Sequence, residues 1–243
     1  NSPAEPPMAL ALGTYSLIVG AGATGVTTRY DVAPPGGTSK FASVLALGGG
    51  TAATLDYAAR YSGGGAAIST ASFREGGIGI PFMNSAGGDA WNTTAQNSSA
   101  GGGGGAGAVG ADAPTQLIAG DGGAGIASSI TGSSVTRAGG GAGGSYYTGG
   151  TGGAGGGGDG ASITAVGTAG TANTGGGGGG SASRTVTLQP GSDGGSGVVI
   201  FSVLTGTGIT FSGGVTQTSA TVGSNTVYTV TATATTSETF TIG

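Results

Sequence analysis

The chain has 243 residues, including 61 glycines and 8 prolines but no cysteine or histidine, and its formal net charge at pH 7 is −4. This composition excludes disulfides and thiolate metal sites, and the acidic balance with six scattered basic residues argues against nucleic acid as a partner. A charged fraction of 7% and a mean hydropathy of +0.19 argue against a disordered chain. No apolar run approaches the length of a membrane span, and the glycines lack the every-third period of collagen.

Residues 1–12 contain a Pro-rich start, which we interpret as a linker or a processed end. Apolar and β-prone residues predict a strand over residues 10–19 and a glycine turn over residues 20–25, and a second apolar stretch covers residues 41–47.

The turn after the first strand carries Gly20, Gly22 and Gly25 in the spacing of the dinucleotide-binding fingerprint. The rest of that unit is missing, because residues 26–30 are β-prone and Pro34 and Pro35 follow instead of a helix. We therefore predict no cofactor at this turn.

Residues 51–99 differ from their surroundings because they carry aromatic and charged side chains. Aromatic residues in insertions cannot belong to a close-packed glycine scaffold, so two roles are open for them. They cover edges of the scaffold or form a small satellite core, or they are exposed and contact a receptor or partner. The candidate contact residues are Tyr57, Tyr61, Phe82, Trp91, Tyr146 and Tyr147.

Residues 101–180 consist largely of glycine runs, and we predict that they form the scaffold of the protein. Glycine weakens helices and strands, but it lets neighbouring backbones approach more closely than any side chain allows. Extended helices with three residues per turn point their N–H and C=O groups outward in three directions. Several such polyglycine-II helices, packed side by side, can satisfy one another's backbone groups. A short hairpin or apolar seam is expected around Ile126, Ile130 and Val135.

Four aspartates lie beside glycine or alanine: Asp112, Asp121, Asp159 and Asp193. Residues 155–160 resemble one turn of a calcium-binding repeat, but such sites need tandem copies and this copy is single. The favoured interpretation is that each carboxylate accepts hydrogen bonds from N–H groups of turns, with a bound cation as the alternative. We predict no metal site.

Strands are expected over residues 184–188 and 197–204, followed by an antiparallel meander over residues 208–242. The expected fold is mostly β and irregular, with almost no α-helix. It comprises a packed polyglycine-II lattice with flanking strands over residues 13–204 and a small antiparallel β module over residues 205–243.

Catalysis has little support. Without histidine or cysteine, the usual nucleophile–base pairs are excluded. Carboxylate pairs would have to be assembled from Asp56, Glu75 and Asp89, whose spacing shows no such design. We predict that the protein is not an enzyme.

Several pieces of the chain, in order, resemble the glycine-rich domains of bacteriophage tail-fibre and other virion proteins. The pieces are residues 14–22, 39–41 with 46–50, 168–174 with its glycine run, and 194–200. The resemblance implies a polyglycine-II sandwich, as in the tip adhesins of T-even-like phages, whose loops touch the host receptor.

Two functions follow as expectations. The first is a virion appendage protein, a tail fibre or receptor-binding adhesin, that contacts a host cell-surface glycan or outer-membrane protein. The second is a purely structural virion decoration or a subunit of a secreted or cell-surface filament. Both place the chain outside the cell, in contact with other virion or filament subunits and in a homo-oligomeric or larger assembly.

Overall fold

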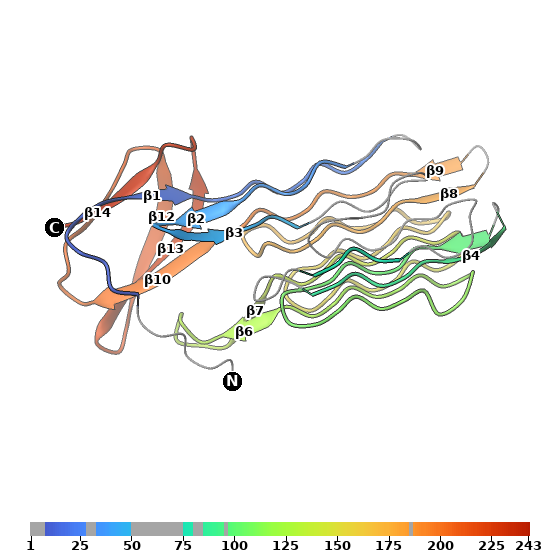
Figure 1. Ribbon diagram of the computed structural model, residues 1–243, viewed down its shortest axis with the longest axis horizontal. Helices are drawn as coiled ribbons and strands as arrows, with labels where there is room; N and C mark the ends of the chain where they lie inside the picture. Colours follow the sequence, from blue (N-terminus) through green and yellow to red (C-terminus); the bar gives the residue numbers. More distant parts are fainter. Residues whose placement is uncertain (1–7, 28–32, 50–74, 80–84, 95–96, 185–186) are drawn as a thin grey trace.

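The computed structural model describes residues 8–27, 33–49, 75–79, 85–94, 97–184 and 187–243. These residues form a β module at one end and a bundle of extended glycine-rich segments that runs away from it (Figure 1). The described residues contain no α-helix, as predicted, and no helix with the length and apolar character that a membrane crossing requires. The strands are β1 (Gly13–Ile18), β2 (Ser39–Phe41), β3 (Val44–Ala46), β4 (Trp91–Thr94), β5 (Asn97–Ser99), β6 (Ile126–Ser128), β7 (Val135–Arg137), β8 (Ala182–Arg184), β9 (Thr187–Gln189), β10 (Val199–Leu204), β11 (Ile209–Phe211), β12 (Val215–Val222), β13 (Asn225–Thr233) and β14 (Thr239–Ile242).

The β module consists of two sheets that pack face to face. One has the order β11-β14-β1-β2-β3 and the other the order β10-β13-β12. Their shared core is formed by Leu17, Phe201, Val230 and Phe240, each at most 8% exposed. Phe41 stacks on Phe240 with ring centroids 4.7 Å apart and contacts Phe201 at 4.8 Å, so aromatic side chains join the two sheets.

The strands after Leu204 do not form the expected meander. β11 pairs with β14, and β1 pairs with the other edge of β14, so the first strand of the chain lies beside the last. β12 and β13 form a hairpin that adds to β10. The boundary expected near Leu204 falls at the end of β10, and strands from both sides of it share both sheets. Sequence patterns show where strands occur, but long-range pairing decides which strands are neighbours.

Two further stretches of the sequence are each divided between two short strands. The apolar stretch 41–47 is interrupted by a turn in which Ala42 has a φ of 52°, so it forms a β2–β3 hairpin. Residues 184–188 belong to two short antiparallel strands, β8 and β9, instead of one strand. The hairpin expected between Ile126 and Val135 is present as β6–β7, although Ile126 is 43% exposed.

The glycine-rich segments form a hydrogen-bonded lattice with a period of three residues. At its centre, segment 138–144 contacts segments 100–106, 119–125, 149–153, 155–161 and 174–180 through backbone hydrogen bonds. The carbonyls of residues 138, 141 and 144 accept from residues 106, 103 and 100, at 2.8–3.0 Å. The N–H groups of residues 140 and 143 donate to residues 123 and 120, and those of 139 and 142 donate to residues 155 and 158.

This pattern is that of extended helices with three residues per turn, because every third residue forms hydrogen bonds with the same neighbouring segment. The close packing depends on missing side chains: a Cβ on Gly160 would lie 1.8 Å from the carbonyl oxygen of Gly143. The predicted polyglycine-II lattice is therefore confirmed in its hydrogen-bond geometry.

Glu238 ties two loops of the β module together. The residue is 8% exposed, and its carboxylate accepts hydrogen bonds from the hydroxyls of Ser212 and of Thr235, the latter at 3.0 Å. The Ser212 hydroxyl also accepts from the N–H of Thr239 at 3.0 Å, so the loop before β12 is joined to the loop before β14. The hydrogen bond from Ser212 is the main cause that lowers the pKa of Glu238 below 4.5, with a second contribution from Thr235.

We expect Glu238→Gln to reduce the stability of the protein at neutral pH. Because the folded-state pKa is lowered, the charged carboxylate stabilises the fold above its unfolded pKa near 4.5, and this contribution is lost as pH falls through the lower folded pKa. Urea unfolding of both proteins across the acidic range measures the effect. The difference between wild type and variant should shrink as the pH is lowered. A difference that stays constant from neutral to strongly acidic pH would contradict the assignment.

A candidate binding surface at the distal tip of the lattice

The end of the lattice far from the β module carries a cluster of loops, which we call the distal tip. It comprises the β4–β5 hairpin, the turns 114–118, 145–148 and 162–165, and the β8–β9 hairpin. β4, β8 and β9 mark this end in Figure 1, whereas β6 and β7 lie at the opposite end of the lattice. Each turn reverses the chain between two glycine segments, so the lattice itself brings the loops together.

Backbone contacts link these loops into one surface. Ser99 pairs with Ser145, and Ile118 pairs with Thr148. The N–H of Ile163 donates to the carbonyl of Tyr146 at 3.2 Å. The side-chain amide of Gln189 donates to the carbonyl of Ile163 at 3.2 Å. The tip is therefore a continuous hydrogen-bonded platform, not a set of independent loops.

Ser145 connects several loops of the platform through its hydroxyl group. Its side chain is fully buried, as is that of Ser99, and the two hydroxyl oxygens lie 2.9 Å apart. The Ser145 hydroxyl also donates to the carbonyl of Leu117 at 3.0 Å and accepts from the N–H of Tyr147 at 3.4 Å. These bonds hold the turn 114–118 and the tyrosine pair in fixed positions relative to each other.

Two of the six predicted contact residues are side by side on this platform. Tyr147 is 54% exposed and Tyr146 is half-buried, and their rings meet edge to face with centroids 4.4 Å apart and planes at 87°. Trp91, also half-buried, begins β4 and pairs with Ser99, which in turn contacts Ser145. Tyr57, Tyr61 and Phe82 lie outside the described residues.

The structure adds apolar residues that the sequence analysis did not select. Leu117 and Ile118 are 42% and 43% exposed, and Ile118 is paired with Thr148, directly after Tyr147. Ile163 is hydrogen-bonded to the backbone of Tyr146. The sequence shows that these residues lie in short apolar insertions between glycine runs. It does not show that the insertions meet in space, and for this reason it did not mark them as contact residues.

The aspartates have the acceptor role expected for them, but they serve neighbouring segments instead of turns. Asp121 accepts from the N–H of Thr151 at 2.6 Å, Asp159 from Gly152 at 2.8 Å, and Asp193 from Gly25 at 2.7 Å. Asp112 accepts from the N–H of Asp89 at 2.8 Å. These N–H groups therefore bond to an aspartate side chain, which takes the place that a backbone carbonyl has elsewhere in the lattice. Among the described residues, no three acidic side chains gather in a group that could hold a metal ion.

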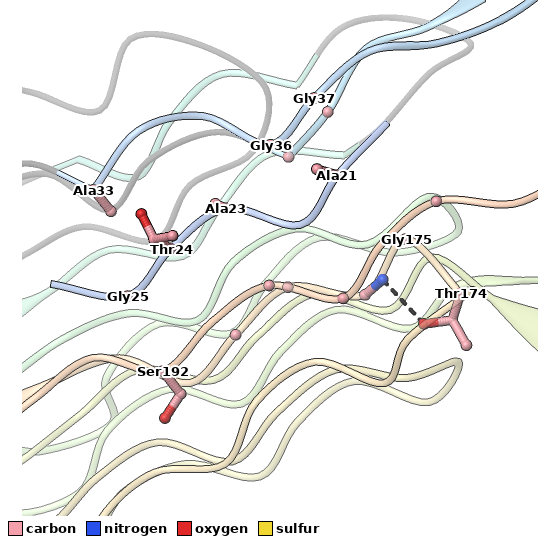
Figure 2. A pocket seen from close by; sticks show the side chains of 18 of the residues that line it. Ala21, Ala23, Thr24, Gly25, Ala33, Gly36, Gly37, Thr174, Gly175 and Ser192 are labelled. Carbon is pink, nitrogen blue, oxygen red and sulfur yellow. Dashed lines mark hydrogen bonds between the residues drawn. The ribbon is translucent and has the colours of Figure 1, made fainter. Parts of the chain in front are cut away.

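A groove of about 410 Å³ runs between two layers of the lattice (Figure 2). Its lining comes from residues within 21–26, 33–39, 46–49, 174–181 and 191–198, together with Arg137 and Ala138. Most lining residues are glycine, alanine, serine or threonine, and within the described lining Arg137 is the one charged residue. The hydroxyl oxygen of Thr174 accepts a hydrogen bond from the N–H of Gly176 at 3.1 Å, so this hydroxyl bonds within the lining of the groove. The described lining holds no pair of titratable groups for acid–base or nucleophilic chemistry.

Gly25, part of the dinucleotide-like spacing, also lies in this groove wall. Gly20 accepts at its carbonyl from the N–H of Gly197 at 2.9 Å, and Gly25 donates to Asp193. No helix follows within the described residues. The spacing therefore reflects lattice packing.

The family model described as a glycine-rich domain matches residues 3–204. Neither the curated proteins nor the solved structures contain a match to the chain. The match spans the first strand, the whole lattice and β10, which carries the chain back into the β module. Because the match covers most of the sequence, this chain belongs to the glycine-rich domain family.

Proposed function

We propose that the protein is a non-enzymatic adhesive appendage that presents the distal tip to a receptor on a cell surface. The observation that carries the proposal is the Tyr146–Tyr147 pair, in which Tyr147 is exposed, on a platform held together by the buried hydroxyls of Ser99 and Ser145. In line with the resemblance noted in the sequence, we propose a bacteriophage tail fibre or a related receptor-binding virion component. The receptor is a host glycan or an outer-membrane protein.

The physical case rests on preorganisation. Tyrosine offers a large amphipathic contact area at a low cost in side-chain entropy. Binding also costs the ordering of loops, and a platform that is already hydrogen-bonded avoids most of that cost. Leu117 and Ile118 add exposed apolar area beside the tyrosines. Clustered apolar and aromatic residues of this kind are typical of interaction surfaces.

The test is binding of the purified, fluorescently labelled chain to intact cells of a panel of bacterial strains. We expect a double Tyr146→Ala, Tyr147→Ala variant to lose about 30-fold or more in affinity, as for a hot spot worth about 2 kcal/mol. Its melting temperature should stay close to that of the wild type, because Tyr147 is 54% exposed and the hydrogen bond that Tyr146 accepts from Ile163 uses the backbone carbonyl, which alanine keeps. Treating the cells with protease or with periodate separates a protein receptor from a glycan.

Val109→Ala is the matched control. Val109 is 64% exposed and follows Ala108, whose backbone bonds to Gly105 and Ala124, at the end of segment 107–113 that is farther from the turn 114–118. Its replacement should leave binding unchanged. Equal binding by the wild type and the double tyrosine variant, or equal losses in the variant and the control, would exclude the tip as the receptor site.

A second candidate function is a purely structural one, as a virion decoration or filament subunit. It is favoured by the surface of the β module, where residues 199–243 contain one charged residue, the buried Glu238. Imaging of assembled particles separates the candidates: a repeating array that covers the tip supports the structural role, and a free distal tip supports adhesion.

A further inference from the structure

The two sheets of the β module end in edge strands of very different lengths. In the five-stranded sheet the edges are β11 and β3, with three residues each. In the other sheet the edges are β10, with six residues, and β12, with eight. β12 is therefore the longest edge in the described part of the module, and residues 216–221 are all exposed.

An edge strand presents a row of N–H and C=O groups that only another extended chain can pair. Proteins usually protect such edges with charges, proline, bulges or short strands. β12 contains no charged residue and no proline. A register shift between Thr216 and Gln217 distorts one end, but residues 217–222 pair regularly with residues 225–230 of β13. Val222 lies beside Gly132 of the β6–β7 loop, so the exposed residues 217–221 are the ones that remain as a template.

We propose that β12 of a second copy of this chain pairs with β12 in antiparallel orientation and joins two three-stranded sheets into one of six strands. A two-fold axis makes the same patch serve both copies. A sheet of six strands is of ordinary size. The proposal concerns the β module and does not depend on the function proposed for the distal tip.

The sequence of β12 suits pairing with itself. In an antiparallel pair, the side chains of two residues that lie directly opposite each other are on the same face of the sheet. The two-fold axis must therefore pass midway between the two copies of one residue, so that this residue lies opposite itself. With the axis at Ser219, Thr218 lies opposite Ala220 and Gln217 opposite Thr221. Ser219 then lies opposite Ser219 of the other copy, a pair of small hydroxyl residues of the kind that stabilises sheets, and no like charges meet in any of these pairs. A strand from a different protein would need side chains that complement those of β12, and β12 has no charged side chain that would select such a partner.

The position of β12 is compatible with both functions considered above. β12 and its neighbours lie at the end of the molecule opposite β4, β8 and β9 (Figure 1). Two copies joined at β12 would therefore leave both distal tips accessible.

The experiment measures the mass of the full chain by sedimentation equilibrium over a range of concentrations. We expect a reversible dimer for the wild type and for Ser224→Lys, a control in the exposed turn after β12. Ser219→Lys places two positive charges opposite each other across the axis, and it should weaken the dimer by about tenfold or more. A monomer at all concentrations, or a dimer that Ser219→Lys does not weaken, overturns the proposal.

Single cysteines test the pairing directly, because the chain has none of its own. Opposite residues of antiparallel strands have Cα atoms about 4.5–5.5 Å apart, within the range that a disulfide spans. Under mild oxidation, Ser219→Cys should form a covalent dimer much faster than Ser224→Cys. Equal rates for the two variants would exclude β12 as the interface.

Discussion

Gly143→Ala should unfold or severely destabilise the protein, although it adds a single methyl group. Gly143 lies in the central segment of the lattice, where its N–H donates to Gly120 at 2.9 Å and its carbonyl accepts from Gly150 at 3.0 Å. A Cβ at this position would lie 2.2 Å from the carbonyl oxygen of Ala100. That neighbour is backbone, held by its own hydrogen bonds, so it cannot rotate away.

The expected loss is about 3 kcal/mol or more, at the top of the range for overpacked cores. Chemical denaturation of the full chain measures it. Gly213→Ala is the control, because a Cβ at Gly213 would meet no atom within 4 Å. If both variants unfold at the same denaturant concentration, backbone contact between glycine segments is not what stabilises the lattice.

Phe240→Ala should cost about 3–5 kcal/mol, as expected for removal of a buried aromatic side chain. Phe240 is 1% exposed in β14 and packs against Phe41, Tyr15 and Phe201, which come from β2, β1 and β10. Its loss would leave a cavity where both sheets meet. Because β1 and β10 lead directly into lattice segments, we expect the loss to weaken the attachment of those segments as well.

Thermal unfolding followed by circular dichroism gives the size of this effect. Phe240→Leu should cost less than Phe240→Ala, since it retains most of the buried volume. Leu12→Ala, at a position that is 76% exposed, should leave the unfolding temperature nearly unchanged. Equal stabilities of Phe240→Ala and Leu12→Ala would show that this aromatic core contributes little.

The glycine lattice could be predicted from sequence because its physical cause is local. A run such as residues 139–144, with one alanine among five glycines, has few other ordered structures available. The acceptor role of the aspartates was predictable for the same reason, since a short carboxylate beside glycine readily bonds a nearby N–H. Which N–H it reaches was not, because Asp121 and Thr151 are thirty residues apart.

The candidate site shows the same limit. Tyr146 and Tyr147 were selected because aromatic side chains do not fit between glycine segments, and the structure places them on the surface of the distal tip. Leu117 and Ile118 were not selected, since an apolar pair in a short insertion has no meaning until its neighbours are known. The role of Ser145 in connecting the loops could not be predicted either, because serine is common in turns and this serine is buried only where three loops converge.

By itself, the sequence determined the kind of structure: a largely irregular, helix-free fold built on a glycine lattice with β-strands, and no His- or Cys-based chemistry. Those conclusions follow from which residues are present and from their local spacing. Tertiary structure alone decided that β1 lies beside β14, that β12 is a free edge, and that the turns 114–118, 145–148 and 162–165 meet at one tip. Glycine segments have no side chains to distinguish one neighbour from another, so the lengths of the turns and the strands at their ends determine the order in which they pack.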